Sequence, residues 1–151
     1  MVVDLWGEQK KVDVEVLVDD EVDNDTLFNL IFPSIKKSIA FVNEQRSEIE
    51  QALIDDKNVE LANDWAESAP VSQEEENCYI MNDGQKVYLP ITEEDFRKNI
   101  RIDEAEICFS DSFDDISTHL LIGYTPDIFA GHVLDIDIDK DNKITCIGLA
   151  G

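Results

Sequence analysis

The sequence predicts an α+β fold, in which helices pack on one face of a mostly antiparallel sheet. Three observations predict it: an alternating strand pattern near the start of the chain, a helical pattern directly after it, and several short strand patterns over the last third. Helices and strands that are segregated along a chain are typical of this class, whereas regular strand–helix alternation predicts a parallel sheet. We therefore expect a long helix near the N-terminus and shorter helices beside it.

The first strand is predicted over Lys11–Asp19, where β-branched and acidic residues alternate. Its inward positions are Val12, Val14, Val16 and Val18. Residues Met1–Trp6 form either a short strand or an edge extension of this one. The acidic connector Asp19–Asp25 follows, and Asn24 or Asp25 is suited to cap a helix because a negative group is favourable at a helix N-terminus.

The long helix is predicted from Leu27, with one apolar stripe over about seven turns. Pro33 interrupts it, so either the helix bends there or a longer helix starts with proline in its first turn. The stripe consists of Leu27, Leu30, Ile31, Ile35, Ile39, Val42, Ile49 and Leu53. A second helix is predicted over Asn58–Glu67, with Leu61, Ala62, Trp65 and Ala66 facing inward.

The middle of the chain predicts a loop, a hairpin and a short helix. The loop is Ala69–Asn77, and the hairpin turns at Asn82-Asp83-Gly84 between Cys78–Met81 and Gln85–Leu89. Thr92 and Asp95 resemble a capping box for a helix that runs from Glu93 to about Asn99. Four further strands are then predicted, over Ala105–Phe109, His119–Tyr124, His132–Ile138 and Lys143–Leu149.

The composition predicts a single acidic domain over residues 1–151. The net charge is −23, and 43% of the residues are hydrophobic, which is ordinary for a folded protein. Binding to nucleic acid depends on Lys and Arg that displace counterions, and anionic lipid attracts basic segments, so we expect neither a nucleic-acid partner nor a membrane partner.

The cysteines and the N-terminus predict a cytoplasmic protein. Cys78, Cys108 and Cys146 form no CxxC pair, so we expect reduced thiols and no zinc or redox site. The first residues show neither a basic segment nor an apolar run of the length found in signal peptides. We expect no cofactor.

Four aspartates alternate with other residues near the C-terminus: Asp135, Asp137, Asp139 and Asp141. A calcium loop that starts at the first of them needs Gly at its sixth position and Glu at its twelfth, where this chain has Lys140 and Cys146. Strand alternation explains the pattern instead, because it turns the carboxylates to solvent and their aliphatic neighbours to the core. We predict no metal site here.

Two histidines are candidates for chemistry. His132 shares the inward face of its predicted strand, and Asp127 is a carboxylate that can hold it as a general base or metal ligand. If its strand pairs with that of His119, the two imidazoles and a carboxylate make a minimal metal set. The alternative is a buried histidine that hydrogen-bonds a backbone carbonyl. Gly131 supplies either a close backbone approach or a positive φ.

Two further groups are candidates for binding. Tyr79 and Tyr88 can stand opposite each other on the predicted hairpin, where aromatic side chains are suited to meet a partner. The acidic clusters create a negative field that steers basic molecules. The binding carboxylates we select from these clusters are Asp111, Asp114, Asp115, Asp135 and Asp137.

Four short segments of the chain form a distinctive set: Asn63-Asp64-Trp65, Thr92-Glu93-Glu94-Asp95-Phe96, Phe129-Ala130-Gly131-His132-Val133 and Leu149-Ala150-Gly151. Together they resemble a bacterial family, the domain-of-unknown-function family 2262. The resemblance spans about Asn58 to Gly151, is weaker over the first strand and long helix, and implies no known reaction. The segment from Cys78 to Leu89 departs from the family pattern as an addition.

Two functions follow as hypotheses. The first is a non-enzymatic, immunity-like binding protein that meets a basic partner through its negative surface. The second is a small enzyme or metal-dependent site centred on His132 with Asp127 and His119. The chain has no P-loop, GxGxxG, GxSxG or HExxH motif to support a common enzyme class. A homo-oligomer formed through a sheet edge is a third interpretation.

Overall fold

The computed structural model describes residues 1–7, 12–18 and 21–151. It contains a six-stranded sheet with the order β1-β2-β5-β6-β7-β8 and a separate two-stranded hairpin, β3-β4. The six strands are β1 (Val2–Val3), β2 (Val12–Leu17), β5 (Ile100–Phe109), β6 (Ile116–Tyr124), β7 (Val133–Ile138) and β8 (Ile144–Ala150). Only the β2–β5 pair is parallel among these neighbours, so the predicted α+β class with a mostly antiparallel sheet is confirmed.

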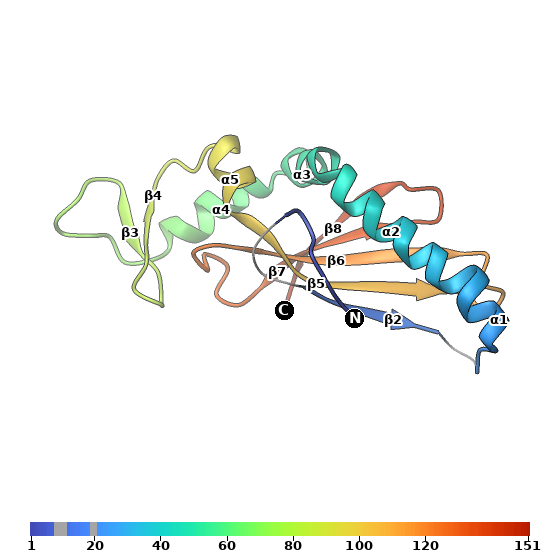
Figure 1. Ribbon diagram of the computed structural model, residues 1–151. Coiled ribbons are helices and arrows are strands. Elements are labelled where there is room, and N and C mark those ends of the chain that lie inside the picture. The colour runs from blue at the N-terminus through green and yellow to red at the C-terminus, as the bar shows by residue number, and fades with distance from the viewer. Residues whose placement is uncertain (8–11, 19–20) are drawn as a thin grey trace.

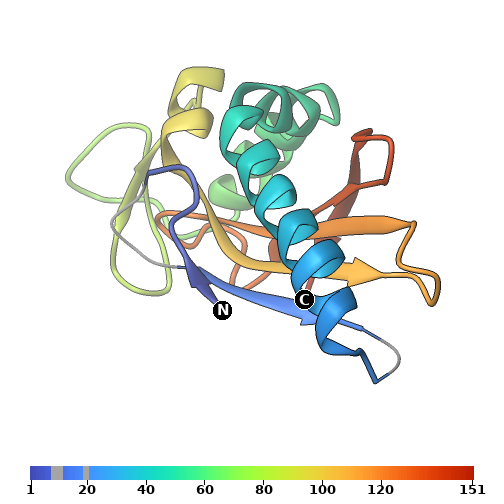
Figure 2. The same ribbon diagram turned by 45° about the vertical axis from the view of Figure 1, so that its right-hand side comes forward.

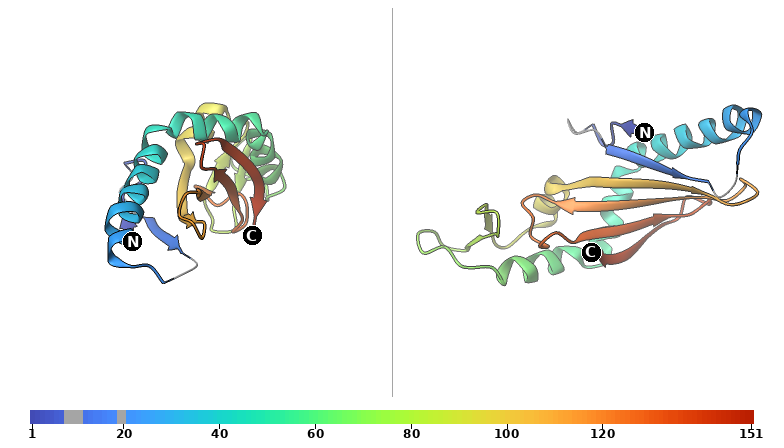
Figure 3. Two further views of the ribbon diagram at one scale, coloured as in Figure 1. Left: turned by 90° about the vertical axis from the view of Figure 1, so that its right-hand side faces the viewer. Right: turned by 90° about the horizontal axis from the view of Figure 1, so that it is seen from below.

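The helices lie together on one face of the large sheet (Figure 1). They are α1 (Asn24–Thr26), the π-helical turn η1 (Leu27–Ile31), α2 (Phe32–Glu44), α3 (Arg46–Asp55), α4 (Asn58–Glu67) and α5 (Glu93–Asn99). Helix α2 runs obliquely above the strands (Figure 2), and the view from below shows the strands with no helix in front of them (Figure 3). Among the described residues, the sheet is therefore covered on one face and open on the other.

The longest helical run covers residues 24–44 and follows the first strands, so the prediction of an N-terminal helix is corrected. Its cap is Asp23 rather than Asn24 or Asp25, because the Asp23 carboxylate accepts a 2.7 Å hydrogen bond from the Thr26 amide. This hydrogen bond also lowers the pKa of Asp23 below its ordinary value. Lys11, Asp19 and Asp20, at the predicted ends of the first strand and in the connector, lie outside the described residues.

Pro33 lies in the first turn of α2, which confirms one of the two predicted alternatives. The wider π-helical turn that precedes it shifts the helical register, so Leu30 is 41% exposed instead of facing inward. The apolar stripe is not one helix, because the backbone leaves helical geometry at Gln45, with φ −99° and ψ 23°. Ile49 and Leu53 are nevertheless fully buried in α3.

Strand alternation places the hydrophobic core between the sheet and the helices. The inward residues of β5, β6 and β7 are buried: Ala105, Ile107, Phe109, Thr118, Leu120, Ile122, Leu134, Ile136 and Ile138. The residues between them face the open side. The sequence predictions for β7 and β8 are confirmed within one residue at each end, while β5 begins at Ile100 and β6 at Ile116, both earlier than predicted.

Local predictions in the middle of the chain are also confirmed. Helix α4 covers the predicted Asn58–Glu67, and α5 begins with the capping box formed by Thr92 and Asp95. The hairpin consists of β3 (Cys78–Ile80) and β4 (Lys86–Tyr88). Ion pairs tie α3 to α5, because the buried Glu50 carboxylate contacts Arg46 at 2.8 Å and Arg97 at 3.3 Å.

None of the helices in the described ranges has the length and apolar character needed to cross a membrane.

Candidate functional site

The open face of the large sheet gathers acidic side chains from several strands. We define the open acidic face by six carboxylates, two from each of three strands: Asp13 and Glu15 on β2, Glu104 and Glu106 on β5, and Asp135 and Asp137 on β7. Each alternates with an inward residue of its strand, which is why all six point away from the helices.

Register aligns one row of charges across the sheet. Glu15 on β2 is opposite Glu106 on β5, Glu106 is opposite His119 on β6, and His119 is opposite Asp137 on β7. Like charges placed directly opposite on neighbouring strands destabilise a sheet, so the Glu15–Glu106 pair has an energetic cost. The row therefore concentrates negative charge on the solvent face at a cost to the stability of the sheet.

His119 places an imidazole within this row of carboxylates. Its Nε2 lies 3.4 Å from Asp137 Oδ1, and the two side chains are 40% and 29% exposed. Arg101, at one end of the face, is held by Asp103 at 2.9 Å between Nε and Oδ1. The remaining carboxylates therefore determine the electrostatic character of the face.

Two shallow depressions lie on the open acidic face. The first, of about 490 Å³, runs between β2 and β5 and is lined by Asp13, Glu15, Glu104 and Glu106. The second, of about 180 Å³, lies over β6 between β5 and β7, and its lining includes His119 and Asp135. The Oδ1 atom of Asp135 is buried and has no hydrogen-bond partner among the described residues. A buried carboxylate oxygen of this kind is suited to accept a donor from a bound partner.

The structure does not bring His132, Asp127 and His119 together. His132 lies just before β7 on the helix side, half-buried, with its ring centroid 5.5 Å from that of Trp65. His119 is on the opposite face of the sheet, because it points away from its buried neighbours Thr118 and Leu120. Among the described residues there is no cluster of three or more His, Cys, Asp or Glu with metal-binding geometry.

Asp127 has a local structural contact. Its Oδ1 accepts a 3.0 Å hydrogen bond from the Gly131 amide, and Gly131 has a φ of +86°. Of the two roles proposed for Gly131, the structure therefore shows the positive φ. The His132 amide in turn donates to the Phe129 carbonyl at 3.0 Å, so this segment forms a closed turn that leads into β7.

The two hairpin tyrosines are not opposite each other, which corrects the prediction. Tyr79 pairs with Val87 and Tyr88 pairs with Cys78, so the two rings point to different faces of the hairpin. The Tyr88 hydroxyl donates to Glu75, which also contacts Lys86. These contacts raise the pKa of Tyr88 and lower that of Glu75. The hairpin and the β5–β6 turn project from opposite ends of the molecule (Figure 1).

The aspartates of the β5–β6 turn organise the turn itself. Asp114 Oδ1 accepts hydrogen bonds from the hydroxyls of Ser112 and Ser110, and these lower the pKa of Asp114 below its ordinary value. The Asp115 amide donates to the Ser110 hydroxyl at 3.1 Å. Asp111 is exposed in the same turn. Of the predicted binding carboxylates, only Asp135 and Asp137 lie on the open acidic face.

Sequence reasoning missed the carboxylates that β2 and β5 contribute. The alternation that identified Asp135 and Asp137 also runs through β5, where Glu104 and Glu106 are separated by the buried Ala105. A bulge between Ile102 and Glu104 changes the alternation and hides the first half of this strand. The parallel pairing that places Glu15 beside Glu106 leaves no local signal in the sequence.

The fold and this face define a small α+β protein with a half-covered, mostly antiparallel sheet and an acidic open side. Residues 3–149 match the model of a family described as Uncharacterized protein conserved in bacteria (DUF2262), and the chain belongs to this family. The resemblance identified in the sequence is thereby confirmed, and the match also includes the first strand and the long helix. No curated protein and no solved structure matches the chain.

Proposed function

We propose that this protein is a non-enzymatic, immunity-like binding protein that captures a basic partner on its open acidic face. The observation that carries the proposal is the row in which Glu15, Glu106 and Asp137 are aligned across three strands around His119. A partner that presents Lys or Arg side chains relieves the repulsion within this row, and the free energy of relief contributes to binding.

Apolar groups beside the carboxylates support a protein partner. Leu17 on β2 is 41% exposed and Ile147 on β8 is 61% exposed, and Leu121 lies half-buried between Glu104 and Asp135. Interfaces combine apolar contacts with charged groups that set orientation and association rate. A basic toxin or a nucleic-acid enzyme has the corresponding positive surface, and this protein would shield that surface.

We place the interaction in the cytoplasm. Cys78 and Cys146 are free thiols, and thiols persist in a reducing compartment.

The test compares two triple variants that change the net charge equally. The first carries Glu106→Gln, Asp135→Asn and Asp137→Asn on the open acidic face. The matched control carries three exposed substitutions elsewhere: Glu60→Gln, Glu74→Gln and Glu76→Gln. Each protein is immobilised and used to capture proteins from a bacterial lysate in low and in high salt, and the captured proteins are identified by mass spectrometry.

We expect wild type and the control to retain a basic protein in low salt and to release it in high salt, because screening weakens contacts between exposed charges. The face variant should not retain it. Capture that is lost equally in both triple variants would show that only net charge matters, and the absence of any basic protein would contradict the proposal.

A further inference from the structure

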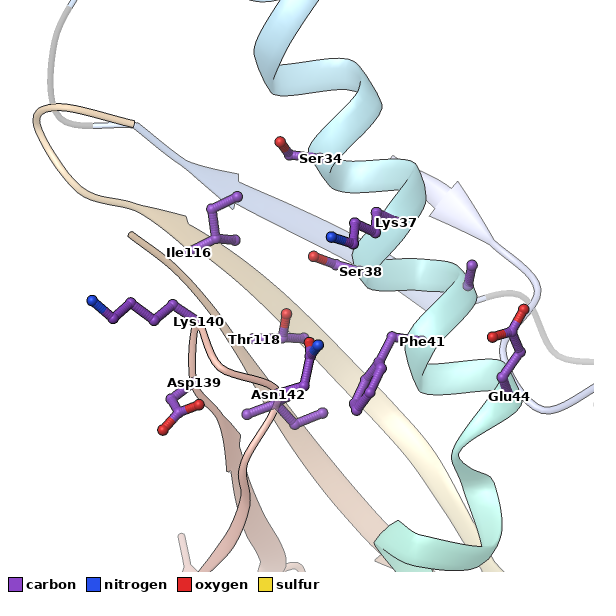
Figure 4. Close-up of a pocket in the computed structure, with 12 residues that line it drawn as sticks. Ser34, Lys37, Ser38, Phe41, Glu44, Ile116, Thr118, Asp139, Lys140 and Asn142 are labelled. Carbon is purple, nitrogen blue, oxygen red and sulfur yellow. The ribbon is translucent and has the colours of Figure 1, made fainter. Parts of the chain in front are cut away.

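A groove separates helix α2 from the sheet at the end of the molecule where the β7–β8 turn lies. Its volume is about 300 Å³, and Figure 4 shows side chains that enter it from α2, from β6 and from the turn. It lies on the covered face, so it is distinct from the open acidic face. The volume matches the lower end of the range found for small-molecule sites.

Two lysines border this groove in a protein that has few of them. The chain contains nine lysines and three arginines against 35 acidic residues. Lys37 extends from α2 over the gap, and Lys140 lies at the groove's mouth in the β7–β8 turn (Figure 4). Neither lysine forms an ion pair with a carboxylate in the described part of the chain. Lys37 is therefore available to an anion, whereas the charge of Lys140 also interacts with the exposed Asp114 and helps to lower the pKa of that carboxyl.

A hydroxyl lies at the floor of the groove. It belongs to Thr118, a residue that is 5% exposed and lines the groove, and its oxygen is not among the fully buried side-chain atoms that lack a partner. Figure 4 shows the hydroxyl directed toward α2, where Ser38 is half-buried on the facing side. A ligand in the groove can accept a hydrogen bond from this hydroxyl, and such a bond is stronger when the acceptor is charged.

Two carboxylates, Asp139 and Glu44, line the groove together with the two lysines. Asp139 Oδ1 accepts hydrogen bonds from the amides of Asp141 and Lys143, both at 2.9 Å, and thus closes the β7–β8 turn. Glu44 is exposed at the C-terminal end of α2. Phe41 and Ile116 supply apolar surface to the walls.

We propose that this groove binds a small oxyanion, a phosphate or a carboxylate, between Lys37, Lys140 and the hydroxyls of Thr118 and Ser38. Lys37 and Lys140 supply the opposite charge, and their flexible stems allow both ammonium groups to close on one anion. The hydroxyls donate hydrogen bonds to its oxygens, which are stronger when the acceptor is charged. The Asn142 amide side chain, on the turn, adds a further donor. This inference does not depend on the proposed capture of a basic partner.

The test uses the full-length, ¹⁵N-labelled protein and two probes, inorganic phosphate and acetate, at constant ionic strength. We expect saturable shifts of the backbone amide signals of Ser38, Thr118 and Asn142. Lys37→Gln and Thr118→Val should each weaken the affinity about fivefold, which corresponds to the net contribution of one hydrogen bond. Thr118→Val preserves the side-chain shape, so the fold is retained.

The matched control is Lys36→Gln, which removes the same charge from the neighbouring exposed position of α2 outside the groove. Its affinity should stay within about twofold of wild type, since a charge outside the site acts only through screened solvent. Shifts with phosphate alone would identify a phosphoryl site, and shifts with both probes a site that also accepts carboxylates. The proposal is overturned if neither probe moves these signals, or if Lys36→Gln weakens binding as much as Lys37→Gln.

Discussion

The two faces of the same sheet carry opposite chemistry. The open acidic face aligns carboxylates from β2, β5 and β7, whereas the groove under α2 combines Lys37 and Lys140 with hydroxyl groups. Four of the nine lysines (Lys36, Lys37, Lys140 and Lys143) lie on the two elements that border the groove. The net charge of −23 is the sum over both surfaces. It therefore does not describe how charge is distributed on either of them.

The two sides of the sheet also differ in how their charged side chains are paired. On the covered side, Glu50 is buried but contacts two arginines, so its charge is compensated. On the open side, Glu106 lies between Glu15 and His119 without an ion pair among the described residues. Compensated charge stabilises the fold, while uncompensated charge is available to a partner.

The largest expected effect is a difference in stability between variants of two adjacent β6 residues that face opposite sides of the sheet. Leu120 is fully buried under the helices, whereas Leu121 faces the open side. Leu120→Ala should lower the free energy of unfolding by about 3 kcal/mol, and Leu121→Ala by less than about 1 kcal/mol, because only the first leaves a cavity. Urea denaturation measures both. Equal losses would mean that the open face is also buried, for example by a second copy of the chain.

A second expected effect concerns Cys146, which lies on the covered side of β8 opposite Ile136. Burial, with a smaller contribution from Asp56, raises the pKa of the Cys146 thiol from 9.0 to about 11. Because the thiolate is the reactive form, alkylation by iodoacetamide at pH 8 should be roughly 100-fold slower than for an ordinary thiol of this chain.

Peptide mass spectrometry after quenching measures this rate, with the urea-unfolded chain as the control. The rate should rise steadily as the pH is increased toward 11, since a raised pKa keeps the thiol protonated below that value. Native Cys146 that reacts as fast as in the unfolded chain would contradict the burial of its thiol beside Asn58 at the start of α4.

The smallest expected effect tests the energetic cost of the charge row. Glu106→Gln removes the repulsion from Glu15, so it should raise the free energy of unfolding by about 0.5 kcal/mol in dilute buffer. The gain should shrink in high salt. The control is Glu60→Gln, in the first turn of α4, which should slightly lower stability because it removes a favourable helix-dipole interaction. If Glu106→Gln is instead destabilising, the row is a structural ion network and not a strained binding surface.

Much of the local structure could be predicted from neighbouring residues. The bounds of α4, the capping box of Thr92 and Asp95, and the β7–β8 hairpin follow from patterns that span one or two turns or strands. The predictions were wrong where an irregularity of the backbone interrupts the regular period of a helix or a strand. The π-helical turn before Pro33 displaced Leu30, and the bulge after Ile102 concealed the first half of β5.

The candidate sites were predictable only in part. Alternation turned Asp135 and Asp137 outward, but it does not reveal that β2 pairs with β5 and thereby brings Glu15 to Glu106. Likewise, no spacing in the sequence connects Lys37 on α2 to Thr118 on β6. These neighbours are far apart along the chain, so only the folded arrangement can place them together.

The sequence by itself determined the fold class, the inward and outward sides of most strands, the acidic character and the family. The tertiary structure alone decided which outward residues became neighbours, that His119 and His132 lie on opposite faces of the sheet, and where a groove opens. The physical reason is the distance along the chain over which each feature is determined. Side-chain direction is set by backbone periodicity within a few residues. Contacts between strands and helices depend on pairing between distant segments that minimises the exposed apolar surface.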